Sequence, residues 1–424
     1  MDEQKQRERS TADYANYKPD GAKRADSPDK KYDPEKDRQW GKLLKYIIVL
    51  LAAAAVAGGA VAFFVMKRRA ARNRRPAINP DQRVTPWATQ VENARRKALA
   101  ELPAMVDAGV PTAKAFMVFD FRLADRSIFE AMRVLGGRGG MLEVHCEDPV
   151  LIDAAVASAL QHGDTSPRHH AATRTTEAEA VATHRAMAFA RAADAPVHVV
   201  HLSCADALAF VAEARAGGVR ATAETCPHYL TLTDARYDEP DPLECAKCVI
   251  SPPLRPAADG DALWSALAAG DLSLVATDHV PDRMAVEKGE AARGVSFERI
   301  SNGAPGIETL LSVVYGQGVA TGRITVERMV DLLATTPARR FGLARKGAIE
   351  AGRDADLVLF DPAARRTIRA VELHHTSDFT PYEGMEVRGA VRSVVVRGRP
   401  VIQDGRAVGE RGYGRFVERG EAGG

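Results

Sequence analysis

Residues 197–226 read VHVVHLSCADALAFVAEARAGGVRATAETC and decide the fold class of the chain. Two apolar, β-branched runs, VHVVHLS and VRATAETC, stand at the ends of this stretch. Between them, ADALAFVAEARAGG carries apolar residues at helical spacing and ends in glycine, which predicts a helix and its end. A strand, a helix and a second strand, with hydrophobic rather than alternating strands, indicate a parallel α/β sheet or barrel.

The same order of elements extends in both directions along the chain. Ala-rich helical stretches alternate with three further apolar runs, which are AKAFMVF (113–119), MLEVHC (141–146) and LSLVATD (272–278). After about residue 347 the pattern changes to short strands and turns, as in DADLVLFDP and VRSVVVRGRPVIQDGRAV. The sequence therefore predicts an α/β domain over 97–346, followed by a small β region with a hairpin over 347–424.

Composition excludes several classes of protein. The chain has 424 residues, of which 46% are hydrophobic and 27% charged, so most of it can bury a core. Lys and Arg number 58 against 56 Asp and Glu, and this balance excludes a strongly basic nucleic-acid binder. Aromatic residues make up only 6%, which argues against a stacking platform for single strands. The five cysteines are too few for a disulfide scaffold and fit a reducing compartment.

The first 96 residues differ from the rest. Residues 1–42 contain no Leu, Ile, Val or Phe and are rich in Lys, Asp, Glu and Pro, which predicts a disordered polar tail. Next comes a run of 21 uncharged residues, 46–66, which reads YIIVLLAAAAVAGGAVAFFVM. As a helix it spans roughly 32 Å, close to the thickness of a hydrocarbon core. We expect one transmembrane helix over 43–66; a buried core helix is the alternative.

Basic residues follow this apolar run and set the expected orientation. The segment 67–96 begins KRRAARNRR and is interpreted as a basic juxtamembrane segment and linker. By the positive-inside rule, this cluster favours a cytoplasmic location for the C-terminal domain. The sequence thus predicts a single-pass membrane protein.

Groups able to do chemistry lie in or at the end of each strand-like run. They are Lys114, His145, His201, the triplet Glu224-Thr225-Cys226, and Asp278. In α/β barrels such residues gather at the carboxyl ends of the strands, where the loops form a pocket. Two imidazoles and a carboxylate are ligands that zinc prefers. Each residue alone is more typical of a core or paired side chain, but the order Lys, His, His, Asp predicts a metal site.

Several blocks of the sequence resemble the dihydropyrimidinase/hydantoinase family of cyclic amidohydrolases. They follow one another in the same order and cover about residues 97–418. The blocks are GVPTAKAFMVF, LEVHCEDP, SPRHHAATRTTEAEAVATHRAMAFA, VVHLS, ETCPHYL, VISPPLRP, ATDHV, ISNGAPGIET, TTPARRFGL and KGAIEAGRDADLVLFDP. The resemblance implies a metal-dependent, TIM-barrel-like domain with a β-sandwich appendage that opens the ring of cyclic ureides such as dihydrouracil or hydantoin.

By position, the resemblance assigns a role to each candidate residue. Lys114 would be a carbamylated bridging ligand, and His145 and His201 would hold one zinc ion. Asp278 would bind a second ion and transfer a proton. The backbone groups of Ser251 and Asn302 would hold the amide edge of the substrate. Family members commonly form homo-oligomers, so an oligomer of this chain is also expected.

Two departures from the family pattern bear on activity. The family has a His-x-His pair on its first barrel strand, whereas the first histidine here is His145. Zinc is the expected cofactor, as one or two ions, and the missing pair favours one. Five of eight barrel strands are identifiable, so the barrel is expected to be incomplete. The family also places a Tyr five residues after the bridging lysine, where this chain has Phe119. Losing one such oxyanion donor typically costs about 10²–10³ in rate.

Three interpretations therefore stay open. The chain is a cyclic amidohydrolase with impaired catalysis, or a non-catalytic relative that acts as a membrane-anchored binding or assembly module, or the product of a rearranged or misread coding sequence. Two further features receive structural interpretations. Cys245 and Cys248 form a lone CxxC without a second pair. His169 and His170 are expected in a solvated loop.

Overall fold

The computed structural model describes residues 87–423 of the chain. The predicted tail (1–42), the predicted membrane helix (43–66) and the basic segment as far as residue 86 lie outside the described residues.

The predicted membrane location needs correction. Among the residues that the structure describes, no helix combines the length and the apolar character needed to cross a bilayer. The helices here are short or interrupted by charged residues, because each buries only one face against a sheet or a neighbouring helix. On this finding we do not retain the prediction of a single-pass membrane protein.

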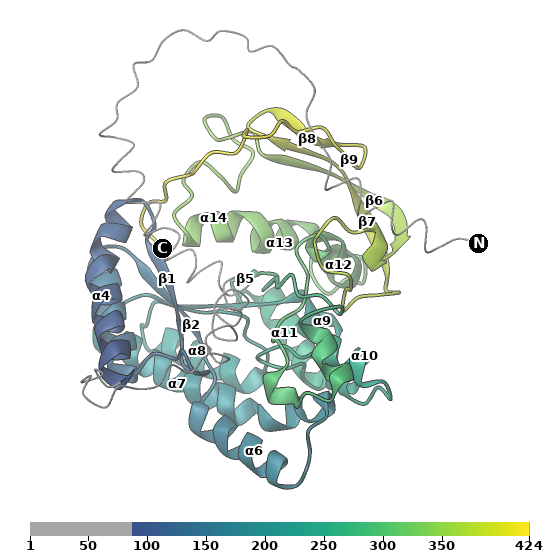
Figure 1. Ribbon diagram of the computed structural model, residues 1–424. Helices are drawn as coiled ribbons and strands as arrows, with labels where there is room; N and C mark the ends of the chain where they lie inside the picture. The colour runs from purple at the N-terminus through teal and green to yellow at the C-terminus, as the bar shows by residue number, and fades with distance from the viewer. Residues whose placement is uncertain (1–86, 424) are drawn as a thin grey trace, which may run out of the picture. The chain divides into compact units, whose positions relative to one another are not determined.

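A parallel sheet of five strands forms the centre of the described part (Figure 1). The strands lie side by side in chain order and every neighbouring pair is parallel. The strands are Thr112–Phe116 (β1), Met141–His145 (β2), Val197–Val199 (β3), Ala221–Thr225 (β4) and Leu274–Val275 (β5). The prediction of a parallel α/β fold is confirmed, with β1 and β5 as the edges of the sheet within residues 87–423.

Helices connect the strands and flank the sheet. Figure 1 shows α7 and α8 on one side of it and α13 and α14 on the other. The longer helices are Trp87–Asp107 (α4), Asp125–Gly136 (α5), Pro149–Gln161 (α6), Thr176–Ala193 (α7), Ala205–Ala216 (α8) and Ala257–Ala269 (α11). Shorter ones are Pro227–Thr231 (α9), Pro242–Lys247 (α10), Leu310–Val314 (α12), Val326–Val330 (α13) and Thr336–Arg340 (α14).

Short 3₁₀ and π-helical turns fill several loops. The 3₁₀ turns are Pro167–His169, Ala171–Thr173, Asp234–Tyr237, Lys288–Arg293, Phe297–Arg299 and Ala370–Glu372. The π-helical turns are Tyr315–Val319 and Asp331–Thr335.

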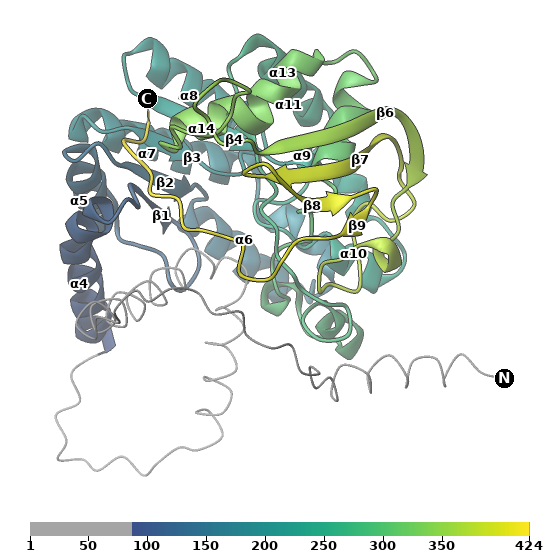
Figure 2. The same cartoon turned by 90° about the horizontal axis from the view of Figure 1, so that it is seen from above.

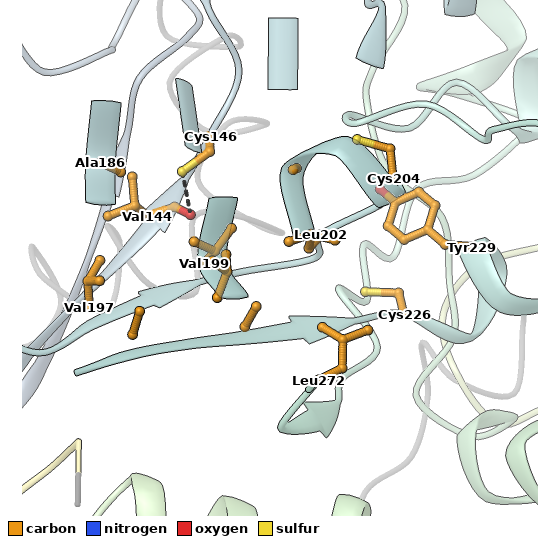
Figure 3. Close-up of a cluster of buried hydrophobic side chains, with 14 of the residues drawn as sticks. Val144, Cys146, Ala186, Val197, Val199, Leu202, Cys204, Cys226, Tyr229 and Leu272 are labelled. Carbon is orange, nitrogen blue, oxygen red and sulfur yellow. Dashed lines mark hydrogen bonds between the residues drawn. The ribbon is translucent and has the colours of Figure 1, made fainter. Parts of the chain in front are cut away.

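The core lies between the sheet and α5, α7 and α8. Val144, Val197 and Val199 are at most 1% exposed and belong to one large apolar cluster that includes Ala186 of α7. Figure 3 shows these valines and Ala186 together. All five cysteines are free and buried, and four of them, Cys146, Cys204, Cys226 and Cys248, belong to this cluster. Because alanine side chains are small, the alanine-rich helices can approach the sheet closely.

The opposite face of the sheet is polar, which corrects the expectation of strands without alternation. Register places Lys114 beside Glu143, Glu143 beside His198, and His198 beside Thr222. Because successive residues of a strand point to opposite faces, the buried valines and this polar row alternate. The polar face therefore presents the chemically reactive side chains, while the apolar face packs against the helices and forms the core.

The C-terminal part forms a second, antiparallel sheet of four strands (Figure 2). Its strands are Leu357–Thr367 (β6), Glu386–Val396 (β7), Arg399–Gln403 (β8) and Arg406–Ala407 (β9). The predicted hairpin corresponds to β7 and β8, joined at Arg397 and Gly398, which both have positive φ. Beyond β9 the chain returns to the first sheet, where Arg419 N donates to Gly109 O and Ala422 N to Gly139 O.

Candidate active site

Two histidines lie in contact at the carboxyl end of the parallel sheet. His145 is the last residue of β2 and His201 follows β3 by two residues. Their ring centroids are 4.5 Å apart, and both side chains are 2% exposed. Lys114 stands on the neighbouring strand β1, with its ammonium 5.0 Å from the ring centroid of Phe116. Parallel strands that end at one edge bring the two histidines together, and Lys114 is near enough for its charge to act on His201.

A buried ion pair holds the ring of His145. Its Nε2 lies 2.6 Å from Glu147 Oε2, and the same oxygen accepts a bond of 2.7 Å from Arg174 Nη1. Burial raises the pKa of the Glu147 carboxyl, but Arg174 and His145 outweigh that effect and hold the pKa at about 2. A carboxylate acceptor makes Nε2 the protonated nitrogen of His145. The lone pair of Nδ1 is then directed elsewhere, as in a metal-binding histidine with a carboxylate partner.

His201 and His228 have buried ring nitrogens without partners. His201 Nδ1 and His228 Nε2 make no hydrogen bond within the described residues. Burial is the main cause that lowers the pKa of His201 well below its usual value, and the neighbouring charges of His145 and Lys114 add to it. Burial likewise lowers the pKa of His228 to about 4, although Asp278 opposes the shift. Both rings are therefore neutral near pH 7 and offer a lone pair.

Asp278 follows β5 in a segment tied to residues farther along the chain. Val280 N donates to Ala304 O at 3.0 Å, and His279 Nδ1 accepts from Gly306 N at 3.0 Å. Burial is the main cause that lowers the pKa of His279, which keeps the ring neutral and its Nδ1 an acceptor. These bonds place Asp278 next to the segment that contains residue 302.

Ser251 and Asn302 are in direct contact. Ser251 Oγ donates to Asn302 Oδ1 at 2.6 Å, and Gly303 N donates to Val249 O at 3.0 Å. Asn302 thus lies between the segment of Ser251 and that of Asp278. Residues from three separate parts of the chain meet here.

Three residues of this region have left-handed backbones. The φ angles are +74° for Phe119, +42° for His201 and +44° for Asp278. Non-glycine residues rarely adopt this conformation, and each instance costs on the order of 1–3 kcal/mol. Such strain gathers where a side chain must point in a direction that regular structure does not provide.

Phe119 packs beside His145. The ring centroids of the two residues are 5.4 Å apart, and the guanidinium of Arg174 lies 5.0 Å from the Phe119 ring centroid. The position that a Tyr occupies in the family pattern is therefore at the histidine pair, and here it presents no hydroxyl.

The donor atoms fit a metal ion in part. The adjacent imidazoles of His145 and His201 are suitable zinc ligands, the second with an unpartnered Nδ1, and within residues 87–423 no carboxylate forms an ion pair with Lys114. Within the described residues, however, no three side chains of the types His, Cys, Asp and Glu gather closely enough to hold a metal.

Three residues near these groups were not predicted. His170 was expected in a solvated loop, yet it is 2% exposed and its Nε2 bonds Ile250 O at 2.7 Å. Lys288 and His228, which carried no prediction, are 0% and 4% exposed. The block ETCPHYL was the one available signal for His228, because it begins with the strand-end triplet Glu224-Thr225-Cys226 and places His228 two residues beyond it.

Comparison with known proteins agrees with this arrangement of strands. A model of the amidohydrolase family matches residues 104–401. The chain belongs to the amidohydrolase family. It is 40% identical over 332 residues to a D-hydantoinase of Streptomyces coelicolor, covering 78% of this chain and 70% of that protein. A D-phenylhydantoinase of Escherichia coli is 36% identical over 335 residues, covering 78% and 71%.

This amidohydrolase has the same fold as several solved structures. The dihydropyrimidinase of Brevibacillus agri superposes with a TM-score of 0.75 at 40% identity, over 77% of this chain and 71% of that one. A D-hydantoinase from a Bacillus species, AR9, gives 0.74 at 41% identity over 76% and 71%. The prediction of a cyclic amidohydrolase of the dihydropyrimidinase/hydantoinase type is confirmed at this level.

Proposed function

We propose that this amidohydrolase opens the ring C–N bond of a cyclic ureide, with His145, His201 and a carbamylated Lys114 as ligands of one zinc ion. The observation that carries the proposal is the contact of His145 and His201, whose ring centroids are 4.5 Å apart beside the strand of Lys114. A bound zinc ion would supply a hydroxide near neutral pH, because it lowers the pKa of its water to about 7.

The other residues act on the substrate and its proton. Asp278 takes the proton of the nucleophile and delivers it to the leaving nitrogen, as a carboxylate in a general acid–base role. The backbone groups of Ser251 and Asn302 hold the amide edge of the ring, and the bond of 2.6 Å between the two side chains, which keeps their segments together, supports this role. In a chain that binds two zinc ions, Asp278 is the proposed ligand of the second. We also propose that the chain forms a homo-oligomer.

The proposal is tested by assaying the purified chain on dihydrouracil and hydantoin and measuring its zinc content. We expect turnover and about one zinc per chain, both lost in Lys114→Ala. Turnover no higher than that of Lys114→Ala would contradict the proposal.

A non-catalytic relative is the second candidate function. The specific observation in its favour is Phe119, whose ring lies 5.4 Å from that of His145 and offers no donor to a developing oxyanion. In that case the same residues bind a cyclic ligand without opening its ring. Isothermal titration with hydantoin separates the two: binding without product favours the second candidate, and hydrolysis excludes it.

A further inference from the structure

The segment 248–252, which carries Ser251, is held by side chains rather than by a strand ladder. Buried carbonyl groups must find donors, and here four side chains supply them at 2.7 Å each. The bonds are Tyr237 Oη to Cys248 O, Lys288 Nζ to Val249 O, His170 Nε2 to Ile250 O, and Tyr229 Oη to Pro252 O. This leaves Ser251 in the middle of a segment whose position is fixed on both sides.

Lys288 is the member of this set that also reaches the segment of Asn302. Its Nζ donates to Val249 O and to Ser301 O, each at 2.7 Å. Val249 precedes Ser251 by two residues, and Ser301 directly precedes Asn302. One ammonium group therefore bridges the two segments, in parallel with the bond from Gly303 N to Val249 O.

The lysine is fully buried, with 0% of the residue exposed. Asp282 Oδ2 lies 4.0 Å from Nζ, at the limit of an ion pair. A buried ammonium is unfavourable unless it is paired and hydrogen-bonded, so the two carbonyl bonds and Asp282 are what keep it charged. An apolar side chain would fill this space without that cost but could not join the two segments.

We propose that Lys288 is a positioning residue for substrate binding, because it sets the distance between the segments that present Ser251 and Asn302 to the ring amide. The inference rests on the proposed function for its substrate, a cyclic ureide, and adds a residue that does not itself touch that substrate.

The ammonium is also near its point of deprotonation. Burial lowers the pKa of Lys288 to about 8, and the charge of Asp282 acts in the opposite direction. The ring of His170 is the other titratable group that responds to this ammonium. Above that pH the two carbonyl bonds lose their charge assistance, which makes a charged bond roughly twice as strong as a neutral one. We therefore expect the KM for the ring substrate to rise above about pH 8.

The test compares Lys288→Met with Lys247→Met. Lys247 is a partly exposed lysine of the nearby helix α10, whose ion pair is with Glu244. Loss of uniform binding raises KM and leaves kcat nearly unchanged, so we expect KM to rise about tenfold in Lys288→Met, with kcat within about threefold. Lys247→Met should behave like the wild type.

Hydrogen exchange gives a readout that does not need turnover. The amide of Gly303 bonds Val249 O across the two segments, so it should exchange about tenfold faster in Lys288→Met and normally in Lys247→Met. Unchanged exchange, or faster exchange with an unchanged KM, overturns the inference. If the wild-type chain turns over neither hydantoin nor dihydrouracil, the proposed function is wrong. Hydrogen exchange at Gly303 then still tests whether Lys288 joins the segments of Ser251 and Asn302.

A second variant serves if Lys288→Met does not fold. Asp282→Asn keeps the size of the side chain and removes the charge that supports the ammonium. In Asp282→Asn, KM should begin to increase at a lower pH than in the wild type, but at pH 6 it should equal the wild-type value. A pH profile identical to that of the wild type would contradict the role of the Lys288 ammonium.

Discussion

Glu147 Oε2 lies 2.6 Å from His145 Nε2, and both side chains are almost fully excluded from solvent. This carboxylate is two residues beyond the histidine it contacts, and Arg174 neutralises it from another part of the chain. The pair therefore fixes both the orientation and the protonated nitrogen of one proposed zinc ligand.

Glu147→Gln is expected to weaken zinc binding by about 10–100-fold, the usual cost of losing the outer partner of a ligating histidine. A competition assay with a chromophoric chelator measures it. Glu179→Gln is a matched control, because Glu179 is equally buried and pairs with Arg255 at 2.9 Å, but holds Ser203 rather than an imidazole. Equal loss of zinc in both variants would show that the effect is structural.

Phe119→Tyr is expected to raise kcat, because it restores a donor beside the histidine pair. An oxyanion donor contributes about 10²–10³ in rate, so a gain of at least tenfold with little change in KM is expected. Phe121→Tyr is the control: that ring stacks on Phe119 at 5.3 Å but is 49% exposed. A chain that stays inactive as Phe119→Tyr would favour the non-catalytic candidate.

The order of strands and helices could be predicted from the local pattern, because apolar runs mark the strands and apolar residues at helical spacing mark the helices. The polar face of the sheet could not. In VHVVHLS the consecutive valines Val199 and Val200 interrupt the alternation around His198, and the register with Glu143 and Thr222 reveals it. His145 and His201 could be proposed as partners because they end neighbouring strands of one parallel sheet.

The sequence did not predict the burial of residues whose contacts are far away along the chain. The burial of His170 depends on Ile250, 80 residues away, and that of Lys288 on Val249 and Ser301. No periodicity or spacing in one sequence encodes such contacts. A histidine or lysine in a loop is solvated in most proteins, so composition alone favours the wrong expectation here.

Acid stability should depend on His170. Burial lowers the pKa of His170 to about 3 from an ordinary 6.5, so between these values the unfolded state binds more protons than the native state. The stabilisation is complete above pH 6.5 and is lost as the pH falls towards 3, amounting to about 2.5 kcal/mol between pH 7 and pH 4.5. Urea unfolding at the two pH values measures it.

His170→Gln removes this titration and should reduce the acid-induced loss of stability by about that amount. His162→Gln, at an exposed histidine whose Nδ1 bonds Ser158 O, is the control and should keep the acid dependence of the wild type. Equal acid dependence in wild type and His170→Gln would show that other groups govern acid unfolding.

Gly303 requires glycine for two reasons, which makes it a direct probe of the Asn302 segment. Its φ is +131°, and a Cβ there would lie 2.3 Å from Val280 Cγ2 and 2.5 Å from Val280 Cβ. Gly303→Ala therefore combines backbone strain with overpacking, and we expect a loss of about 3 kcal/mol or more in the free energy of unfolding. Because the clash pushes Asn302 away from Ser251, KM should rise as well.

Gly218→Ala separates the backbone effect from the clash. Gly218 has a φ of +84°, but a Cβ at this position would meet no atom within 4 Å, so only the strain of a left-handed alanine, about 1 kcal/mol, is expected. Urea unfolding and KM are measured for both variants. If Gly303→Ala were no less stable than Gly218→Ala, the close contact with the Val280 segment would be wrong, and with it the placement of Asn302 between Ser251 and Asp278.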